Sequence, residues 1–422
     1  MKIAVPYGEE KSLQINIPDK NIAWVIDRKS TQRLSEPESK LKGMLRKPTA
    51  GPPLRELAKG SKNVVVLVDD NTRPTPAHVI VPAILDELNE SGVRDKDIEI
   101  IIALGTHRKM NDEEIEKKLG SAKERVRVRN FDCHDESDLI EIGKTSLGFE
   151  IVVSKRVYSA DLIIGVGNIV PHCYAGWAGG GKIIQPGVCG VKTIEGTHIL
   201  AGKIKPISSI VGTLNQPARK LIDEIAIKAG LKFIVNTVLN ENDEIMDMFV
   251  GEPLEAFRKG VKMAEQIYCP NILALADIVL VSSYPADLEY WQASKPVDYA
   301  CLGVKKGGTI ILLTPCPEGI ATMHPELGKL GCMGFQAVCD AYDEGEIEDR
   351  IAAGALMLHS QIREHAEVIC VSHGLTKEDK QSLGFTHAET IDDALQLAFL
   401  KHGGNARIGI MKCGDIMPTL NK

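Results

Sequence analysis

The chain has 422 residues, of which 44% are hydrophobic and 25% charged, and it carries a formal net charge of −7. This length exceeds one typical hydrophobic core, so we expect two or three domains. Because the charge is negative and no basic run stands out, the chain lacks the electrostatic footprint of a nucleic-acid binder. Small anionic ligands fit this composition better than polymers.

The composition also bears on compartment and redox state. The first residues, MKIAVPYGEEKSLQINIP, contain no apolar core of signal-peptide length, and no apolar run has the length of a membrane span. Ten cysteines are scattered, and Cys332 and Cys339 lack C-x-x-C spacing. The pattern therefore indicates neither a disulfide framework nor a zinc site. We expect a cytoplasmic protein with no membrane partner.

Short β-branched runs alternate with amphipathic stretches along the chain. The runs expected to form buried strands cover residues 63–68, 98–104, 162–167, 277–283, 309–314 and 367–372. The helical patterns between them include residues 78–90, 216–230, 254–268, 347–362 and 392–402. This alternation predicts an α/β protein with parallel-type sheets.

A domain boundary is expected near Cys269-Pro270-Asn271, where a long helical pattern stops and a new strand-rich series begins. The apolar segment 406–413 follows the last helical pattern and reads as a strand. We expect it to return to the first domain. The prediction is then a discontinuous first domain, residues 1–270 plus 405–422, and a second domain of residues 271–404.

Polar residues follow each predicted strand. In open α/β sheets, ligands bind beyond the carboxyl ends of the strands. The polar ends are Asp69 to Arg73, Gly105 to His107, Gly167 to His172, Ser282 to Tyr284, Thr314 to Cys316 and Ser372 to Gly374. Either several of these loops meet at one site, or they are ordinary turns.

The segment GNIVPHCYAGWAGGGKIIQPGVCG, residues 167–190, is the strongest single signal. Its glycines permit positive φ and could turn successive N–H groups toward an anion. Gly176, Gly181 and Lys182 match G-x-x-x-x-G-K of a phosphate-binding P-loop, but Ile183 replaces the hydroxyl residue that binds Mg²⁺. The alternatives are an ordinary P-loop nucleoside triphosphatase, a structural glycine turn and a site for a different cofactor, of which we favour the last.

Other candidate residues surround this segment. His107, His172 and His198 all stand near strand ends or the glycine loop, and Arg73 could hold a carboxylate with two hydrogen bonds. No other histidine or cysteine stands at a recognisable ligand spacing from His198. If His198 binds a metal, a cofactor has to bring most of the other ligands. Lys295, near a probable helix start, is a second anion-binding candidate.

The motifs AGWAGGGKIIQPGVCG, EGTHILAG, DDNTRPTP, ALGTH and YWQASK, with His172 before the first of them, closely resemble the nickel-dependent lactate racemase family. The likeness extends over nearly the whole chain in the same order. It is most specific in the glycine segment and looser over residues 321–372.

The resemblance implies two α/β domains with the active site in the cleft between them. It also implies a nickel-pincer nucleotide, pyridinium-3-thioamide-5-thiocarboxylic acid mononucleotide, either linked covalently through Lys182 or bound non-covalently. The residues that match the family's functional positions are the cofactor lysine Lys182, the nickel ligand His198, the acid/base pair His107 and His172, and the carboxylate-binding set Arg73, Gln292 and Lys295. We add Asp69, Gly179, Gly180, Gly181 and Gly187 as candidate cofactor contacts, and Tyr284 as a candidate substrate contact.

The implied reaction interconverts D- and L-lactate, or a related 2-hydroxy acid, by proton-coupled hydride transfer. One histidine takes the hydroxyl proton while hydride passes to the cofactor, which leaves a bound 2-keto acid, and hydride return on the other face gives the opposite enantiomer. The implied partners are the substrate and the enzymes that make the cofactor and insert nickel.

One departure concerns the substrate pocket. Family lactate enzymes are associated with an additional tryptophan, contributed to the substrate pocket by the second domain. The tryptophans of this chain are Trp24, Trp177 and Trp291, and none follows Trp291. The pocket could therefore suit malate or a longer aliphatic, aromatic or sugar acid instead of lactate. A nucleotide- or cofactor-binding protein without turnover is the alternative of a different class.

Overall fold

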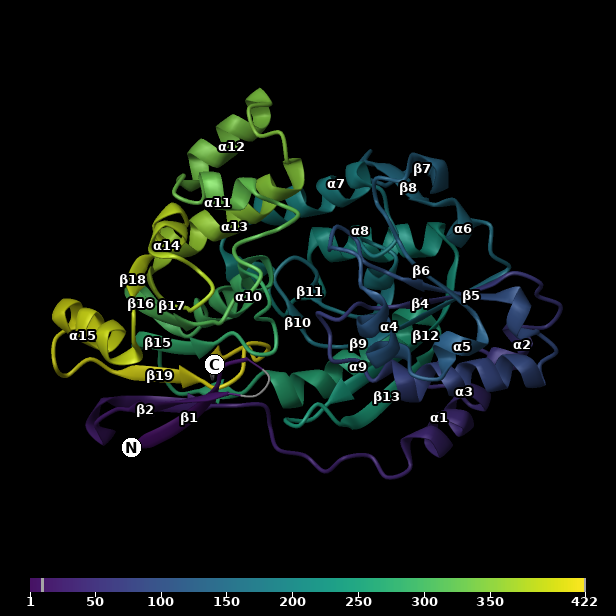
Figure 1. The fold of residues 1–422 in the computed structure, drawn as a ribbon, viewed down its shortest axis with the longest axis horizontal. Helices are drawn as coiled ribbons and strands as arrows, with labels where there is room; N and C mark the ends of the chain where they lie inside the picture. Colours follow the sequence, from purple (N-terminus) through teal and green to yellow (C-terminus); the bar gives the residue numbers. More distant parts are fainter. Residues whose placement is uncertain (9–10, 421–422) are drawn as a thin grey trace.

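Two parallel-type sheets, each flanked by helices, form the molecule. The computed structural model describes residues 1–8 and 11–420. Figure 1 shows the two sheets side by side, with the second domain on the left. This arrangement confirms the predicted fold class of two α/β domains. No helix in the described ranges is both long and apolar enough to cross a membrane.

The first sheet has six strands and is parallel except for one edge. In spatial order its strands are β13 (Ile245–Gly251), β12 (Leu231–Leu239), β9 (Leu162–Asn168), β4 (Val64–Val68), β5 (Ile98–Ile102) and β6 (Arg127–Asn130), with only β13 antiparallel to its neighbour. The central strand β4 reads VVVLV, and all five residues are buried. Such a run is typical of a parallel strand covered on both faces.

Helices cover both faces of this sheet. The helices of the first domain are α1 (Pro37–Arg46), α2 (Leu54–Leu57), α3 (Ala77–Glu90), α4 (Asp112–Leu119), α5 (Ala122–Arg125), α6 (Lys155–Tyr158), α7 (Val191–Gly202), α8 (Pro217–Lys228) and α9 (Pro253–Tyr268). One apolar cluster joins α1 to α5 with one face of the sheet, and a second cluster joins α8 and α9 with the other. The small sheet of β7 (Leu139–Lys144) and β8 (Glu150–Ser154) lies against α7.

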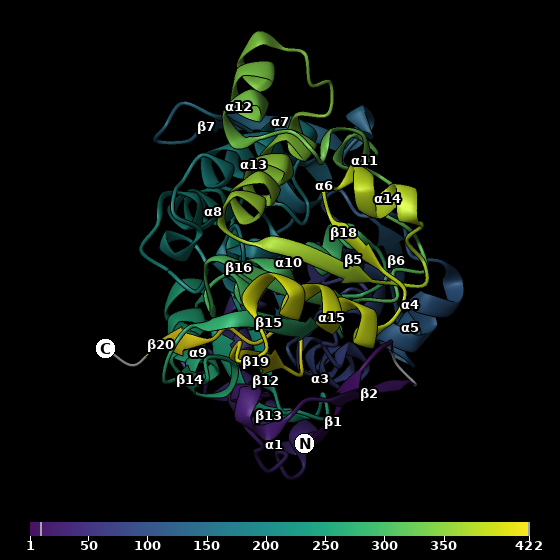
Figure 2. The ribbon, with the colours of Figure 1, turned by 90° about the vertical axis from the view of Figure 1, so that its left-hand side faces the viewer.

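The second sheet is parallel throughout. In spatial order its strands are β18 (Thr386–Ala388), β17 (Glu367–Val371), β16 (Val304–Leu313), β15 (Ala276–Ser282), β19 (Ile408–Met411) and β3 (Ile22–Ile26). Its helices are α10 (Tyr290–Ala300), α11 (Glu326–Leu330), α12 (Phe335–Glu344), α13 (Arg350–His365), α14 (Lys377–Ser382) and α15 (Ile391–His402). The hairpin of β1 (Lys2–Pro6) and β2 (Ser12–Asn16) covers one face together with α15, which lies in front of the sheet in Figure 2.

The prediction for the end of the chain is wrong. The strand in segment 406–413 exists as β19, but it pairs with β15 and β3 of the second sheet and does not return to the first. The amino-terminal strand β3 joins the same sheet, so both ends of the chain contribute to the second sheet. A short parallel pair, β14 (Asn271–Ile272) with β20 (Thr419–Leu420), adds to this arrangement. Apolar periodicity identifies a strand, whereas its sheet is decided by long-range pairing.

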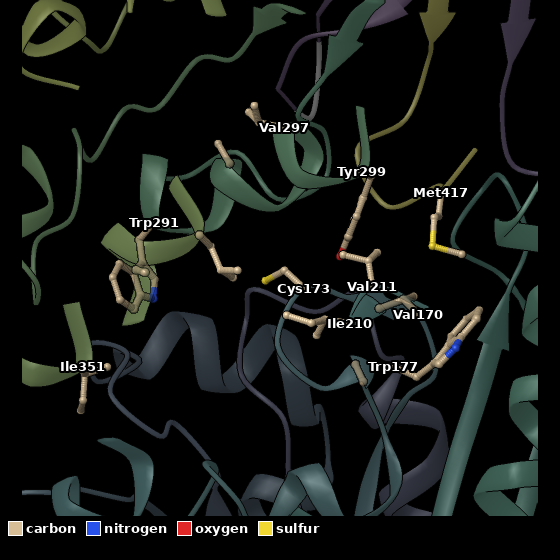
Figure 3. Packing of buried hydrophobic residues seen from close by; sticks show 14 of the residues in the cluster. Val170, Cys173, Trp177, Ile210, Val211, Trp291, Val297, Tyr299, Ile351 and Met417 are labelled. Carbon is tan, nitrogen blue, oxygen red and sulfur yellow. The ribbon is translucent and has the colours of Figure 1, made fainter. Parts of the chain in front are cut away.

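Apolar side chains from both domains pack together where the domains meet. Figure 3 shows Cys173, Ile210 and Val211 of the first domain near Tyr299 of α10, and Trp291 of the same helix belongs to the same apolar cluster. The Tyr299 hydroxyl donates a hydrogen bond of 2.8 Å to the Pro171 carbonyl across this boundary. The helix α10 is therefore fixed against the loop that follows β9.

Candidate active site

A cavity of about 1110 Å³, its open mouth included, lies at the carboxyl ends of β4, β5 and β9, between the two domains. A concave site where a few polar groups converge is typical of a cofactor or small-molecule site. The lining residues include Asp69, Arg73, His107, Asn168, His172, Gly179, Lys182, Gly187 and His198 of the first domain, and Trp291, Ser294, Lys295 and Ala355 of the second. Loops that are far apart in the sequence thus meet at one site.

His107 follows β5 and has bonds on both ring nitrogens. Its Nδ1 lies 2.5 Å from Asp70 Oδ2, and its Nε2 lies 2.9 Å from Gln292 Nε2. The Lys295 ammonium donates to Gln292 Oε1, so the Gln292 amide nitrogen must face His107 and donate to it. The proton of neutral His107 is then on Nδ1, donated to Asp70, and Nε2 presents a basic lone pair.

Asp70 is buried at the base of this chain of hydrogen bonds. Burial alone raises the pKa of a carboxyl, but the charge of His107 and hydrogen bonds from His107 and Thr72 outweigh burial. They hold the pKa of Asp70 well below its ordinary range. Asp70 therefore remains an anion that can orient His107 and stabilise its positive charge.

His172 has the opposite arrangement. It lies on the hairpin of β10 (Pro171–His172) and β11 (Gly176–Trp177), where Nδ1 accepts backbone N–H groups of Tyr174 at 3.1 Å and Ala175 at 3.3 Å. A neutral ring in this position carries its proton on Nε2. Burial, followed by the charges of Lys182 and Lys295, lowers the pKa of His172 well below its ordinary value.

Three cationic side chains share the cavity. Burial and the neighbouring Arg73 charge lower the pKa of Lys182 to about 7, and the same two causes lower that of Lys295 well below its usual range. Within residues 1–8 and 11–420, no carboxylate forms an ion pair with Arg73, Lys182 or Lys295. Bound anions would relieve the mutual repulsion, so the cavity suits a negatively charged ligand.

The glycine turn differs from the expected anion cradle. Only Gly179, with φ of 92°, lines the cavity among the three consecutive glycines. The N–H of Gly180 donates to Asn236 Oδ1, and a Cβ at Gly180 would lie 2.7 Å from Phe257 Cγ. A Cβ at Gly181 would lie 2.9 Å from Ala226 Cβ. These two glycines therefore allow close packing on α8 and α9, and the N–H of Gly180 is bonded within the protein and does not face an anion in the cavity.

That packing places Lys182. The short 3₁₀ helix η4 (Gly180–Ile183) fits beneath α8 and α9, and its lysine side chain enters the cavity. Gly187 also lines the cavity, and a Cβ there would lie 2.2 Å from the Ile183 carbonyl oxygen. Position 187 therefore needs glycine, because the chain folds back tightly on residue 183.

His198 is held by α7. Its Nδ1 donates to the Ile194 carbonyl at 2.9 Å, which leaves the Nε2 lone pair toward the cavity. Burial lowers the pKa of His198 to about 4, so the ring is a neutral donor at ordinary pH. In the described part of the chain, no three His, Cys, Asp or Glu side chains are grouped as a metal site. A metal at His198 would therefore depend on ligands from a bound group.

Two predicted substrate contacts, Gln292 and Tyr284, are not among the residues that line the cavity. Gln292 is buried and bonded to His107 and Lys295, one step behind the cavity wall. Tyr284 is absent from the lining residues, and its hydroxyl lies 3.5 Å from Asp243 Oδ2. The predicted substrate contact at Tyr284 is therefore not supported, because the turn after β15 directs this side chain elsewhere.

Asn168 was not singled out from the sequence. It ends β9, is buried, and neither its Nδ2 nor its Oδ1 has a hydrogen-bond partner, although it lines the cavity. An unpaired buried amide costs free energy unless a ligand satisfies it. The sequence signal was the Gly-Asn pair at the carboxyl end of a buried strand. Asp69, by contrast, is already bonded to Lys118 and Thr75.

Comparisons with known proteins identify the family of this chain. Sequence profiles of the lactate racemase N-terminal and C-terminal domains match residues 7–208 and 273–415. Lactate racemase of Thermoanaerobacterium thermosaccharolyticum is 32% identical over 75% of both chains, and that of Lactiplantibacillus plantarum is 29% identical over 98% of both.

Solved structures give the same result. The lactate racemase apoprotein from T. thermosaccharolyticum superposes with a TM-score of 0.87 at 27% identity, covering 100% of both chains. A Thermotoga maritima protein shares the fold, with a TM-score of 0.75 at 22% identity over 93% of this chain and 100% of its own. By the two profile matches and the 32% identical relative, this chain belongs to the lactate racemase family.

Proposed function

We propose that this chain is a racemase of lactate or a related 2-hydroxy acid, working by proton-coupled hydride transfer with a nickel-pincer nucleotide. The observation that carries the proposal is the pair of histidines in one cavity. His107 has an unprotonated Nε2 that accepts a hydrogen bond from Gln292, and His172 has its proton on Nε2. Inversion at carbon requires a proton to be taken up or released on either face of the substrate, and two imidazoles held in opposite tautomers suit that need.

The residues of the cavity fit the proposed cofactor. Lys182 has the lowered pKa of a nucleophilic amine, suited to a covalent link, and His198 offers one neutral nitrogen to nickel. Asn168 offers a donor and an acceptor without partners. When bound, the group would supply reversible hydride acceptance. Enzymes that make the cofactor and insert nickel are then required partners.

The chain's own residues would handle the carboxylate and the proton. Arg73 and Lys295 hold the substrate carboxylate, with Gln292 positioned between Lys295 and His107. His107 Nε2 takes the hydroxyl proton, and Asp70 stabilises the resulting charge. A bound carboxylate and a lysine neutralised by attachment weaken the charges that depress the pKa of His172. We assign the second proton to His172, whose pKa rises when these charges are weakened, while burial, the larger cause of its lowering, remains.

The wall from the second domain bears on the substrate. Trp291 is present there, while Ser294 and Ala355 are small. This wall leaves room for a side chain larger than the methyl group of lactate. A chiral assay of holoprotein should therefore cover short, aromatic and dicarboxylic 2-hydroxy acids.

Replacement of either histidine tests the assignment. We expect His107→Ala and His172→Ala to lower racemisation by about 10²- to 10⁴-fold, because each removes one acid/base group. Protein co-expressed with the cofactor-making enzymes should retain the adduct mass on Lys182 and its nickel. His134→Ala, at an exposed histidine, is the matched control.

Two outcomes would contradict the proposal. Full racemisation by either single variant would refute the two-histidine assignment. Protein purified with ATP and Mg²⁺ in place of nickel and a Lys182 adduct would favour a nucleotide-binding protein without turnover.

A further inference from the structure

Three consecutive residues of the loop after β5 each bond to a different residue of the second domain. The pairs are Thr106 Oγ1 with His324 Nε2 at 2.9 Å, His107 Nε2 with Gln292 Nε2 at 2.9 Å, and Arg108 Nη2 with Glu318 Oε1 at 2.8 Å. The loop that carries His107 is thus attached to the second domain on both sides of the histidine. We refer to residues 106–108 as the clasp.

His324 is the best-fixed partner of the clasp. Its Nδ1 lies 2.7 Å from Asp349 Oδ2, and its ring stacks on Trp291 with centroids 4.1 Å apart and planes 24° apart. The Asp349 side chain also caps α13 by accepting N–H groups of Ile351 and Ala352. With Nδ1 donating to Asp349, Nε2 accepts the Thr106 hydroxyl proton. A continuous chain of contacts therefore runs from α13 to the residue beside His107.

Two contacts of the clasp differ in their exposure to solvent: the contact of Thr106 with His324 is the more buried, and that of Arg108 with Glu318 is the more exposed. His324 is buried with its side chain 7% exposed, whereas the Arg108–Glu318 pair is 34% and 31% exposed. Water and salt weaken an exposed pair much more than a buried contact. Thr106 and His324 should therefore hold the loop geometry, and Arg108 should add little once they are in place.

We propose that His324 is a positioning residue, which uses the Thr106 hydroxyl and the Trp291 ring to fix His107 and one wall of the cavity in a single closed arrangement. His324 is not among the cavity-lining residues, so it acts through these two neighbours. Its effect on turnover rests on the proposed racemase function. Its effect on the geometry of the clasp does not.

Paired substitutions of Thr106 test this role in the holoenzyme. Thr106→Val keeps the side-chain shape and removes the hydroxyl, whereas Thr106→Ser keeps the hydroxyl. We expect Thr106→Val to lower kcat by about 10- to 100-fold, with KM changed less, because displacement of an acid/base group by about 1 Å costs about 10²-fold. Thr106→Ser should stay near the wild-type kcat, and both variants should keep nickel. Thr386→Val, on β18 and bonded to Glu367, is the control.

Hydrogen–deuterium exchange of residues 103–110 gives a readout independent of turnover. We expect faster exchange in Thr106→Val and in His324→Phe, which preserves an aromatic ring on Trp291, but not in Thr106→Ser. If the wild-type holoenzyme racemises no 2-hydroxy acid, the proposed function fails while exchange still tests the clasp. The positioning role would be overturned if Thr106→Val had the kcat and the exchange rate of the wild type. It would also be overturned if kcat fell only in proportion to loss of nickel.

Discussion

Asp70 determines which nitrogen of His107 faces the cavity. Its carboxylate is 2.5 Å from Nδ1 and is bonded also to the Thr72 hydroxyl at 2.6 Å. A carboxylate accepts only, so it holds the proton on Nδ1 and keeps Nε2 basic. An amide in its place can donate to Nδ1 and move the proton to Nε2.

Asp70→Asn should therefore lower kcat by about 10²- to 10⁴-fold while the shape of the site is conserved. Burial raises the pKa of Asp70, but the effects of His107 and Thr72 are larger and hold the pKa low. Wild-type Asp70 therefore stays ionised throughout the range above its ordinary pKa. Steady-state kinetics of holoprotein with verified nickel content make the measurement. Asp135→Asn, on an exposed turn, is the control. Unchanged kcat in Asp70→Asn would show that His107 needs no fixed tautomer.

Burial changes the protonation, and so the reactivity, of a second residue, Lys182. An ordinary lysine with a pKa near 10.4 is almost entirely protonated at neutral pH. Burial and Arg73 bring the pKa of Lys182 to about 7, so a large share of the amine is neutral there. A neutral amine is the form that attacks an acyl or thioacyl carbon.

At the scale of elements, α7 and α13 meet at unusually small residues. A Cβ at Gly354 of α13 would lie 2.8 Å from the carbonyl carbon and oxygen of His198, and a Cβ at Gly202 of α7 would lie 2.8 Å from the Gly354 oxygen. The helix that carries His198 is therefore in backbone contact with the second domain. Close helix contact of this kind leaves no room for a methyl group.

Gly354→Ala should push α13 away from α7. We expect the free energy of unfolding to fall by about 1–3 kcal/mol, and nickel content to fall because His198 moves. Chemical denaturation and metal analysis provide the measurements. Gly43→Ala in α1 is the matched control, since a Cβ there would have no neighbour within 4 Å beyond the adjacent residues and the backbone of its own helix, and it should stabilise by up to about 1 kcal/mol. Equal effects of the two substitutions would refute this account of the helix contact.

The elements themselves were largely predictable because their patterns are local. The run Asn63–Val68 predicted β4, and the helical pattern Leu254–Tyr268 predicted α9. Polar residues at strand ends also indicated the site, since parallel strands bring their carboxyl ends to one edge. His107, His172 and Lys182 accordingly line one cavity.

What the sequence did not reveal depends on long-range contacts. The sheet to which β19 belongs is set by pairing with β15 and β3, which no local pattern encodes. Gly180 and Gly181 could equally favour an anion turn or close packing, and the neighbours Phe257 and Ala226 decide for packing. The His324–Thr106 contact joins residues 218 positions apart and has no motif.

At the scale of the whole molecule, a buried arginine contributes to the contact between the domains. Arg28 follows β3 and is buried, with ion pairs to Asp243 of the first domain at 2.6 Å and to Asp415 near the end of the chain at 2.7 Å. The pKa of Arg28 stays well above its ordinary value, because the charges of Asp415 and Asp243 outweigh burial. Together with the continuous apolar cluster, this network fixes how the domains meet.

Buried neutral histidines should make the apoprotein sensitive to acid. Burial lowers the pKa of His198 in the first domain and of His359 in the second to about 4, against about 6.5 in an unfolded chain. Between these values the unfolded state binds more protons, so the free energy of unfolding falls as the pH falls. Each histidine contributes up to about 3 kcal/mol to this loss by pH 4.

The effect can be isolated at His359, which bonds to the Tyr290 hydroxyl and the Leu383 carbonyl, away from the cavity. His359→Gln should lower stability at pH 7, because it disturbs those bonds, but the urea midpoint should then decline less steeply between pH 6.5 and pH 4.5 than in the wild type. His134→Gln, at an exposed site, should leave the slope unchanged. A slope in His359→Gln equal to that of the wild type would mean that burial of this imidazole carries no proton linkage, and the acid sensitivity would have to come from other groups, such as His198, His172 and the carboxyl of Asp70, whose pKa is lowered.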